Sequence, residues 1–241
     1  MSRHDAECDS GSDTRSEQNA HMARRRMYDA SAAFYSLTFP LIWRFGFPAL
    51  HRWVEGELRG CAKILDAGTG TGYWAQRIAE GGKGREVIGV DFSREFLRRA
   101  RRASLDGNIR FVEADIQSLP FDKDYFDVIF CCGVLDTFPD VRPALKEFRR
   151  VLSAEGKVLL VLRGKHPFVS RISESLFRLY VGMSRVIMMR SLRAFSVSSD
   201  LWNREPLCER LTPLVAECGL RIIGLQGGPL LTTATLVRSG E

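Results

Sequence analysis

Apolar runs alternate with segments of helical spacing from residue 63 onwards. Five runs predict buried strands: KILDA (63–67), REVIGVD (85–91), NIRFVEAD (108–115), FDVIFCC (126–132) and GKVLLVL (156–162). The intervening segments 73–80, 94–103 and 141–152 have the apolar spacing of amphipathic helices. Because continuous apolar strands need cover on both faces, this pattern predicts a doubly wound, parallel α/β sheet.

The flanks of this region follow other patterns. Residues 1–22 are polar and rich in serine and aspartate, which predicts a disordered tail. Residues 24–57 are aromatic and helical in spacing, and Pro40 and Pro48 are expected to divide them into the short helices of a cap.

The pattern of apolar and polar residues changes in the last third of the chain. Residues 168–190 form a long amphipathic helical pattern, and a helix is expected at 206–218. The apolar runs 221–226 and 230–237, joined by GGP, are close enough to pair antiparallel. We therefore expect a seven-stranded, mostly parallel sheet in one domain, residues 23–241, with a cap at 23–58 and a helical insert at 163–206.

Charge is distributed unevenly. The net charge is +6, yet residues 1–22 carry five acids against two arginines, whereas residues 163–193 carry seven bases against Glu174. No stretch approaches the roughly 20 apolar residues of a membrane span, and the N-terminus lacks the apolar core of a secretory signal. We expect a cytoplasmic protein, with contact at a membrane surface as a further possibility raised by the basic segment.

The six cysteines show neither CxxC pairing nor the spacing of a His/Cys metal site. Several of them fall inside apolar runs, which indicates reduced, buried thiols. Neither a disulfide framework nor a metal site is expected.

The segment ILDAGTGTGYW (64–74) carries the most specific chemistry. Gly68, Gly70 and Gly72 let the backbone turn tightly and approach a ligand closely. An ATPase-type loop would need a lysine followed by Ser or Thr after the last glycine, where this chain has Tyr73 and Trp74. A dinucleotide fingerprint, GxGxxG, fits poorly because these glycines are two apart throughout.

A nucleoside without phosphates fits better. Asp91 ends the second predicted strand, where a carboxylate can accept hydrogen bonds from both ribose hydroxyls. Asp115 ends the third, and it is followed by Ile116, a pair suited to the edge and face of an adenine. Such a ligand would lie across the carboxyl ends of the strands, where open α/β sheets bind ligands.

Four segments carry a family resemblance: ILDAGTGTG, VIGVDFS, EADIQSLPF and ALKEFRRVLSAEGKVLLV. They resemble class I S-adenosylmethionine-dependent methyltransferases, in the small-molecule branch (methyltransferase type 11) that includes the ubiquinone/menaquinone methyltransferases. RMYDASAAFY (26–35) is similar to the tyrosine-containing N-terminal segment of that branch. The resemblance covers about residues 24–162, and it implies S-adenosylmethionine as the cofactor.

The resemblance also implies roles for individual residues. The glycines would pass beneath the methionine portion, Asp66 would position its ammonium, and Asp91 would hold the ribose. Phe92 would pack on the adenine, and Asp115 and Ile116 would hold its edge. The residues expected around the methyl group and the methionine carboxylate are Cys132, Gly133, Tyr28 and Tyr35.

Two positions depart from the family pattern. Ser36 follows Tyr35 where the family usually has aspartate, and Asp136 stands where it often has His or Glu. Both departures fall on the acceptor side, so the resemblance does not identify the acceptor.

Methyl transfer is an in-line displacement that requires alignment of donor and acceptor and exclusion of water. A base helps where the acceptor is a hydroxyl, thiol or ammonium. The candidate catalytic residues are Asp136 and His166, and less favourably His51. Asp136 could equally cap the helix that follows it, His166 could be an incidental loop residue, and His51 a cap-helix residue.

The acceptor is expected to be small and lipophilic or lipid-like: a quinone precursor, a phospholipid headgroup or a hydrophobic metabolite. The aromatic cap favours this. Arg171, Arg178 and Arg185 form a stripe on 168–190 that suits a solvated lid, an anionic membrane or an acidic acceptor. The alternatives are a non-catalytic S-adenosylmethionine-binding partner protein and a nicotinamide oxidoreductase. A nucleic-acid methyltransferase is disfavoured, because CCGVLD stands where base-methylating enzymes carry an (Asp/Asn)-Pro-Pro-(Phe/Tyr) element.

Overall fold

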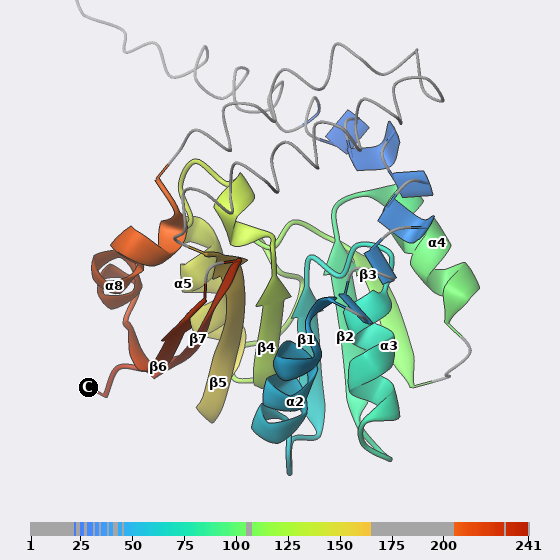
Figure 1. The fold of residues 1–241 in the computed structure, drawn as a ribbon. Coiled ribbons are helices and arrows are strands. Elements are labelled where there is room, and N and C mark those ends of the chain that lie inside the picture. Colours follow the sequence, from blue (N-terminus) through green and yellow to red (C-terminus); the bar gives the residue numbers. More distant parts are fainter. Residues whose placement is uncertain are drawn as a thin grey trace, which may run out of the picture.

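The computed structural model describes residues 46–104, 108–164, 205–228 and 230–240, with shorter groups between residues 22 and 44. Its centre is a seven-stranded sheet with the order β3-β2-β1-β4-β5-β7-β6 (Figure 1). The strands are β1 Lys63–Ala67, β2 Glu86–Asp91, β3 Ile109–Glu113, β4 Phe126–Cys132, β5 Leu152–Arg163, β6 Leu220–Gly227 and β7 Leu231–Arg238.

The first five strands are parallel, and β7 pairs antiparallel with both β5 and β6. The predicted fold class, a mostly parallel sheet closed by an antiparallel hairpin, is confirmed. The chain reverses its direction of winding between β1 and β4, and this switch point is where open sheets of this kind bind ligands.

Helices cover both faces of the sheet (Figure 1). They are α2 Pro48–Glu57, α3 Tyr73–Glu80, α4 Arg94–Ala103, α5 Arg142–Val151 and α8 Leu207–Glu217, with a short 3-10 turn, η1, at Leu135–Thr137. α2 and α3 bury their apolar sides against one face of the sheet, and α5 and α8 bury theirs against the other. α4 packs beside β2 and β3.

Alternate residues of the central strands face the two layers. In β4, Phe130 packs under α3 in one cluster, whereas its neighbour Ile129 belongs to the other. Both side chains are fully buried, and burying such a side chain contributes about 1.5–3 kcal/mol. These central strands therefore read as continuous apolar runs because neither face meets water.

The predicted boundaries differ from the structure in two strands. The third strand ends at Glu113, and Asp115 forms an isolated bridge with Ser118 instead of continuing it. The fifth begins at Leu152, four residues earlier than expected, where Leu152 pairs with Phe126 before a register shift. The other predicted elements that the structure describes agree to within one residue.

The described residues between 22 and 46 are helical, and they lie over the end of the sheet at which β1 and β2 finish (Figure 1). Pro40 is itself helical, and the break expected there adjoins residues 41–42, which lie outside the described residues. Pro48 starts α2, as expected. The tail 1–21 and residues 165–204, with His166 and the basic segment 168–190, also lie outside the described residues.

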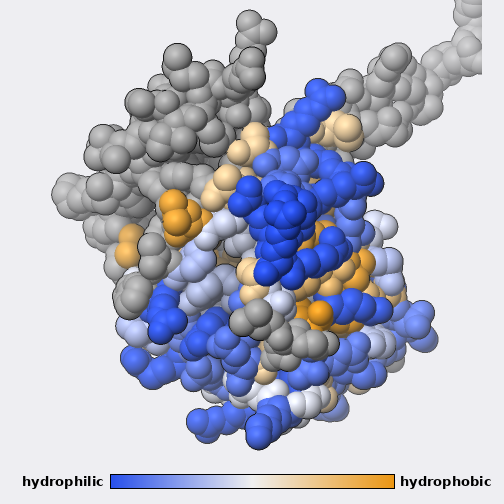
Figure 2. Space-filling model, turned by 90° about the vertical axis from the view of Figure 1, so that its right-hand side faces the viewer, coloured by the Kyte–Doolittle hydropathy of each residue, from blue (hydrophilic) through white to orange (hydrophobic). Residues whose placement is uncertain are grey.

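Figure 2 shows the α4 side as mostly hydrophilic, with small hydrophobic patches. The outer side of α4 contributes exposed arginines at positions 94, 98, 101 and 102 to this side of the molecule. Within the described ranges, no helix is long and apolar enough to cross a membrane. The five described cysteines are free thiols, and Cys131, Cys208 and Cys218 are buried.

Candidate functional site

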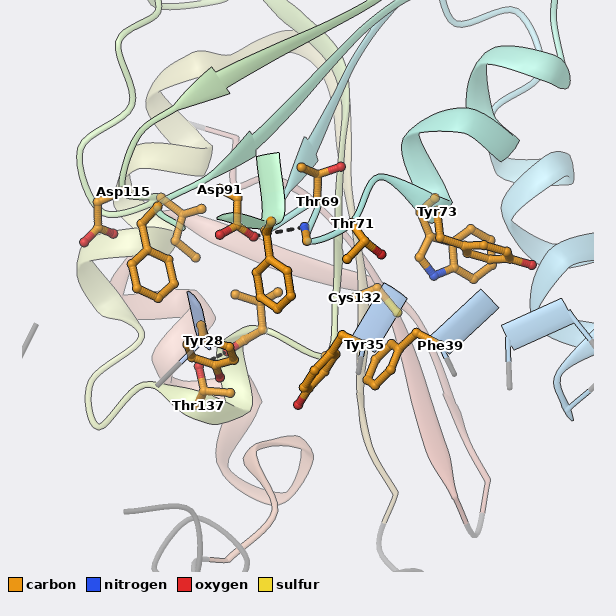
Figure 3. Close-up of a pocket in the computed structure, with 18 of the residues that line it drawn as sticks. Tyr28, Tyr35, Phe39, Thr69, Thr71, Tyr73, Asp91, Asp115, Cys132 and Thr137 are labelled. Atoms are coloured by element: carbon orange, nitrogen blue, oxygen red, sulfur yellow. Dashed lines mark hydrogen bonds between the residues drawn. The ribbon is translucent and has the colours of Figure 1, made fainter. Parts of the chain in front are cut away.

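A cavity lies at the carboxyl ends of the central strands, beneath the N-terminal cap (Figure 3). Tyr28 and Tyr35 form its cap side, each in an edge contact at 5.6 Å between ring centroids, with Phe92 and Phe96 respectively. In Figure 3, Asp115 and Asp91 lie at one side of the cavity, Tyr73 lies at the other, and Thr71 and Cys132 lie between them. The cavity therefore spans several strand ends.

The glycine loop forms the floor. The amides of Gly68 and Thr69 both donate to the Val90 carbonyl at 2.8 Å, which fastens the loop to β2. All three glycines have positive φ angles, +79° at Gly68, +55° at Gly70 and +83° at Gly72. A Cβ on Gly68 would lie 2.4 Å from a Val134 methyl, whereas one on Gly70 would meet no protein atom within 4 Å. Gly70 thus borders open space in the cavity.

Asp91 links the end of β2 to this loop. One carboxylate oxygen accepts the Gly70 amide and the other accepts the Ser93 amide, both at 2.9 Å. Burial raises the pKa of Asp91 to about 6, although these amides oppose the rise. Each oxygen keeps a second lone pair, so the carboxylate can accept further hydrogen bonds from a ligand.

Asp66 and Gly72 lie behind the cavity wall. Gly72 caps the N-terminus of α3, and a Cβ there would lie 2.9 Å from that of Ala100. Asp66 accepts the Thr69 hydroxyl at 2.7 Å, and burial raises its pKa to about 7, with Asp91 adding to the rise. Neither residue is among those that line the cavity.

Asp115 and Ile116 stand where β3 gives way to the next loop, and both line the cavity. A carboxylate oxygen of Asp115 accepts the Gln117 amide at 2.9 Å, which holds the loop in a tight turn. Ile116 is almost fully buried. Phe92 lines the cavity as well.

Cys132 is the last residue of β4 and Gly133 follows it, and both line the cavity. Burial raises the pKa of the Cys132 thiol well above its usual range, so the thiol stays protonated. The structure therefore brings Tyr28, Tyr35, Gly68, Gly70, Asp91, Phe92, Asp115, Ile116, Cys132 and Gly133 around one cavity. Their cofactor roles stay predictions.

Two of the three candidate bases, Asp136 and His51, do not line the cavity, and His166 lies outside the described residues. Asp136 does not line the cavity; it accepts the Arg163 amide at 2.9 Å and the amide of Leu207, the first residue of α8. It therefore joins η1 to β5 and α8 rather than capping α5, whose N-cap is Val141. Burial raises the pKa of Asp136, and its catalytic role stays a prediction, as does that of His166.

His51 is held in the cap. Its Nδ1 lies 3.0 Å from the Phe47 carbonyl, which can only accept, so this nitrogen carries the proton. Nε2 then accepts the Tyr73 hydroxyl at 2.9 Å. His51 does not line the cavity, and it orients Tyr73, whose hydroxyl points away from the cavity centre (Figure 3).

Several lining residues were not anticipated from the sequence: Phe39, Thr69, Thr71, Tyr73, Trp74, Phe96, Ala114, Val134, Thr137 and Phe138. The position of the threonines between the glycines could have indicated that they line the site, because they belong to the same loop. The aromatic cap indicated an apolar site, but not which aromatic residues line it, since an apolar residue at helical spacing looks the same whether it faces a core or a cavity.

The described residues fit S-adenosylmethionine. The open space above Gly70 admits a ligand close to the backbone, and Asp91 offers acceptors beside it. Two acids and several aromatic rings, with no lysine or arginine among the described lining residues, suit a sulfonium cation.

Comparisons with known proteins also point to S-adenosylmethionine-dependent methyltransferases. The profile of a methyltransferase-domain family (Methyltransf_11) matches residues 65–160. A ubiquinone/menaquinone biosynthesis C-methyltransferase UbiE of Syntrophotalea carbinolica is 34% identical over 161 residues, 65% of this chain and 67% of that protein. A malonyl-[acyl-carrier protein] O-methyltransferase of Halorhodospira halophila is 33% identical over 141 residues, 58% of this chain and 48% of that protein.

A solved structure shares the fold. The crystal structure of a TehB-like SAM-dependent methyltransferase from Corynebacterium glutamicum superposes with a TM-score of 0.61 and 17% identity, covering 87% of this chain and 99% of that chain. The chain spans about half the length of further curated relatives that it matches, between 42% and 60%.

Proposed function

The chain belongs to the class I S-adenosylmethionine-dependent methyltransferases, and from this premise we propose that it transfers the methyl group of S-adenosylmethionine to a small, lipophilic acceptor. One observation carries the proposal: a single cavity joins the glycine loop and Asp91 to a wall of aromatic side chains. The first part suits an adenosyl group, and the second suits an apolar molecule beside it.

The bound cofactor supplies a methyl group that its sulfonium already activates. The chain then has to align the methyl group with the acceptor and to exclude water from the site. Asp91 would accept the ribose hydroxyls, Gly70 would let the ligand approach the backbone, and Phe92 with Ile116 would enclose the adenine. Tyr28 and Tyr35 would close the cap over the site.

The cavity wall favours a neutral acceptor. Phe39, Trp43 and Phe138 make this wall apolar, and no lysine or arginine occurs among its described residues. A phospholipid phosphate, or the free carboxylate of a malonyl group, would have no lysine or arginine among the described lining residues as a partner, and a buried anion without a partner is strongly disfavoured. A quinone precursor or another hydrophobic metabolite fits better.

Incubation with methyl-labelled S-adenosylmethionine and organic extracts rich in quinone precursors tests this function. We expect label in the organic phase, and much less of it with the Asp91→Asn variant at a cofactor concentration below saturation. Cofactor binding without transfer to any extract fraction would favour the alternative of a non-catalytic cofactor-binding protein. Label on added RNA or DNA would favour a nucleic-acid substrate.

We also propose that the enzyme meets its acceptor at the cytoplasmic surface of a membrane. The support is the basic, amphipathic pattern of residues 168–190, which lie outside the described residues. Co-sedimentation with anionic vesicles should fall when Arg171, Arg178 and Arg185 are replaced by glutamine. Equal sedimentation of both proteins would contradict the proposal.

A further inference from the structure

Trp74 carries a buried hydrogen-bond donor for which the described residues offer no strong acceptor. Its side chain is only 6% exposed, and its indole N–H has no hydrogen-bond partner of ordinary geometry among the described residues. Leaving a buried donor unpaired costs about 1–3 kcal/mol, and buried tryptophans usually find a partner. Trp74 lines the cavity, so a ligand there is the natural partner.

The surrounding rings hold this donor in place. The ring centroids of His51, Phe130 and Trp43 lie 4.7, 5.1 and 5.9 Å from the indole. Trp74 is also the second residue of α3, directly after the glycine loop. The indole is packed on several sides, and its N–H therefore has a fixed direction.

The Cys132 thiol is at most a weak partner for this donor. Burial raises the pKa of the thiol, Asp66 adds to the rise, and a side-chain hydrogen bond with the Trp74 indole opposes it. The thiol therefore stays protonated, and thiol sulfur is a weak acceptor. An oxygen atom of a ligand would be a stronger partner for the N–H.

The position of Trp74 points to the acceptor rather than the cofactor. Asp91 and Asp115, expected to hold the adenosyl group, lie at one side of the cavity, and Cys132, whose thiol lies beside the Trp74 indole, lies away from both (Figure 3). Phe39 and Trp43 line the cavity as well, and Trp43 packs against the indole. Because no described lining residue is a lysine or arginine, the oxygen in question is a neutral one.

We propose that Trp74 is a specificity-determining residue, whose indole N–H donates a hydrogen bond to a neutral carbonyl or hydroxyl oxygen on a ring of the acceptor. The proposal rests on the proposed methyl transfer and adds the feature by which the site would select its acceptor. It predicts that ring compounds carrying such an oxygen bind more tightly than hydrocarbons of the same shape.

NMR of the full chain tests the contact directly. The chain has four tryptophans, so a ¹H–¹⁵N spectrum contains four indole signals, and Trp74→Phe identifies the one from Trp74. The probes are S-adenosylhomocysteine, then 1-tetralone, which has a ring carbonyl, and tetralin, which has the same rings without it. With the first ligand present, we expect 1-tetralone to shift the Trp74 N–H downfield and tetralin to leave it in place.

Affinities measured by calorimetry provide the second arm. Trp74→Phe should weaken binding of 1-tetralone about tenfold, the scale of one hydrogen bond to a buried donor, and change tetralin binding less than about twofold. Trp53→Phe is the matched control, because Trp53 lies in α2 and does not line the cavity. It should change neither affinity.

Three results would overturn the proposal. The first is a downfield shift of the Trp74 N–H caused by S-adenosylhomocysteine alone, which would assign the donor to the cofactor. The second is no shift with 1-tetralone. The third is that Trp74→Phe weakens the binding of both probes equally. Failure of the proposed function looks different, because S-adenosylhomocysteine would then give no heat and shift no signal.

Discussion

Asp91 connects two parts of the site through one carboxylate. It accepts amides from the glycine loop and from the start of α4, and it faces the cavity. An amide in its place has only one accepting oxygen, so one of the two backbone amides would lose its partner. The residue therefore contributes both to the fold and to ligand binding.

We expect Asp91→Asn to weaken S-adenosylmethionine binding by about 10–100-fold, the scale of one charged hydrogen bond. The free energy of unfolding should also fall, by about 1–3 kcal/mol. Calorimetry and denaturant titration measure the two effects. Asp122→Asn is the control, since Asp122 is exposed and does not line the cavity, and unchanged affinity in Asp91→Asn would contradict the role of Asp91.

Asp66 should make stability depend on pH. Burial raises its pKa from an ordinary value of 3.8 to about 7, so the folded state holds the proton more tightly than the unfolded chain does. The resulting stabilisation is fully present below about pH 4 and is lost as pH rises through about 7. A rise of this size corresponds to on the order of 4 kcal/mol at most.

Denaturant titrations between pH 5 and pH 8 of the protein and its Asp66→Asn variant measure this. The free energy of unfolding of the protein, relative to that of Asp66→Asn, should fall with rising pH. Affinity for S-adenosylmethionine should rise over the same range if the ionised carboxylate positions the ammonium. Parallel stability curves would show that Asp66 does not titrate there.

At the scale of elements, the loop between β1 and α3 uses its glycines for different purposes. Gly72 leaves room for α4, because a Cβ there would lie 2.9 Å from the Cβ of Ala100. Gly70 leaves room only for the cavity. The same residue type thus serves packing at one position and ligand approach at another.

Alanine substitutions should separate these purposes. Gly72→Ala is expected to lower the free energy of unfolding by about 2–3 kcal/mol through backbone strain and overpacking. Gly70→Ala should lower it by about 1 kcal/mol and weaken cofactor binding more than tenfold. Gly60→Ala has a similar φ, +76°, and equally open surroundings, but it lies outside the cavity, so only its stability should change. Full cofactor affinity in Gly70→Ala would contradict this assignment.

The sequence predicted the central elements well because their apolar runs and helical spacing are local signals. Of the two strands that differ, β3 ends early because Asp115 forms a local turn with Gln117 and Ser118, and β5 starts early for a tertiary reason. Leu152–Glu155 joins β5 although Glu155 is exposed, since Leu152 finds Phe126 across the sheet. Asp136 shows the same limit within the site: its partners, Arg163 and Leu207, are distant in the chain.

For the whole molecule, the site depends on the cap staying closed. Tyr28 contacts Phe92, Asp29 accepts hydrogen bonds from the Ser93 hydroxyl and, at 3.4 Å, from the Glu95 amide, and Arg25 pairs with Glu113. These contacts join the cap to the turn after β2, to α4 and to β3, next to Asp91 at the end of β2. A ligand bound between cap and sheet would add contacts to both.

Cofactor binding should therefore stabilise the cap most. At a ligand concentration 100 times the dissociation constant, linkage supplies about 2.7 kcal/mol, which corresponds to about 100-fold slower amide exchange where opening requires ligand release. Hydrogen–deuterium exchange with S-adenosylhomocysteine should show this slowing in peptides that contain Tyr28, Tyr35 and the glycine loop. α8 packs on the opposite face of the sheet, and its exchange should change little.

Tyr28→Ala separates the cap from the rest of the site. It removes the ring contacts with Phe92 and Phe96 and leaves the hydrogen bonds between Asp91 and the glycine loop intact, so the loop should still be protected while the cap loses much of its protection. Uniform slowing across the cap and α8 in the unmodified protein would instead mean that the ligand stabilises the fold as one unit. The cap would then be a fixed wall of the cavity rather than the part that closes on the cofactor.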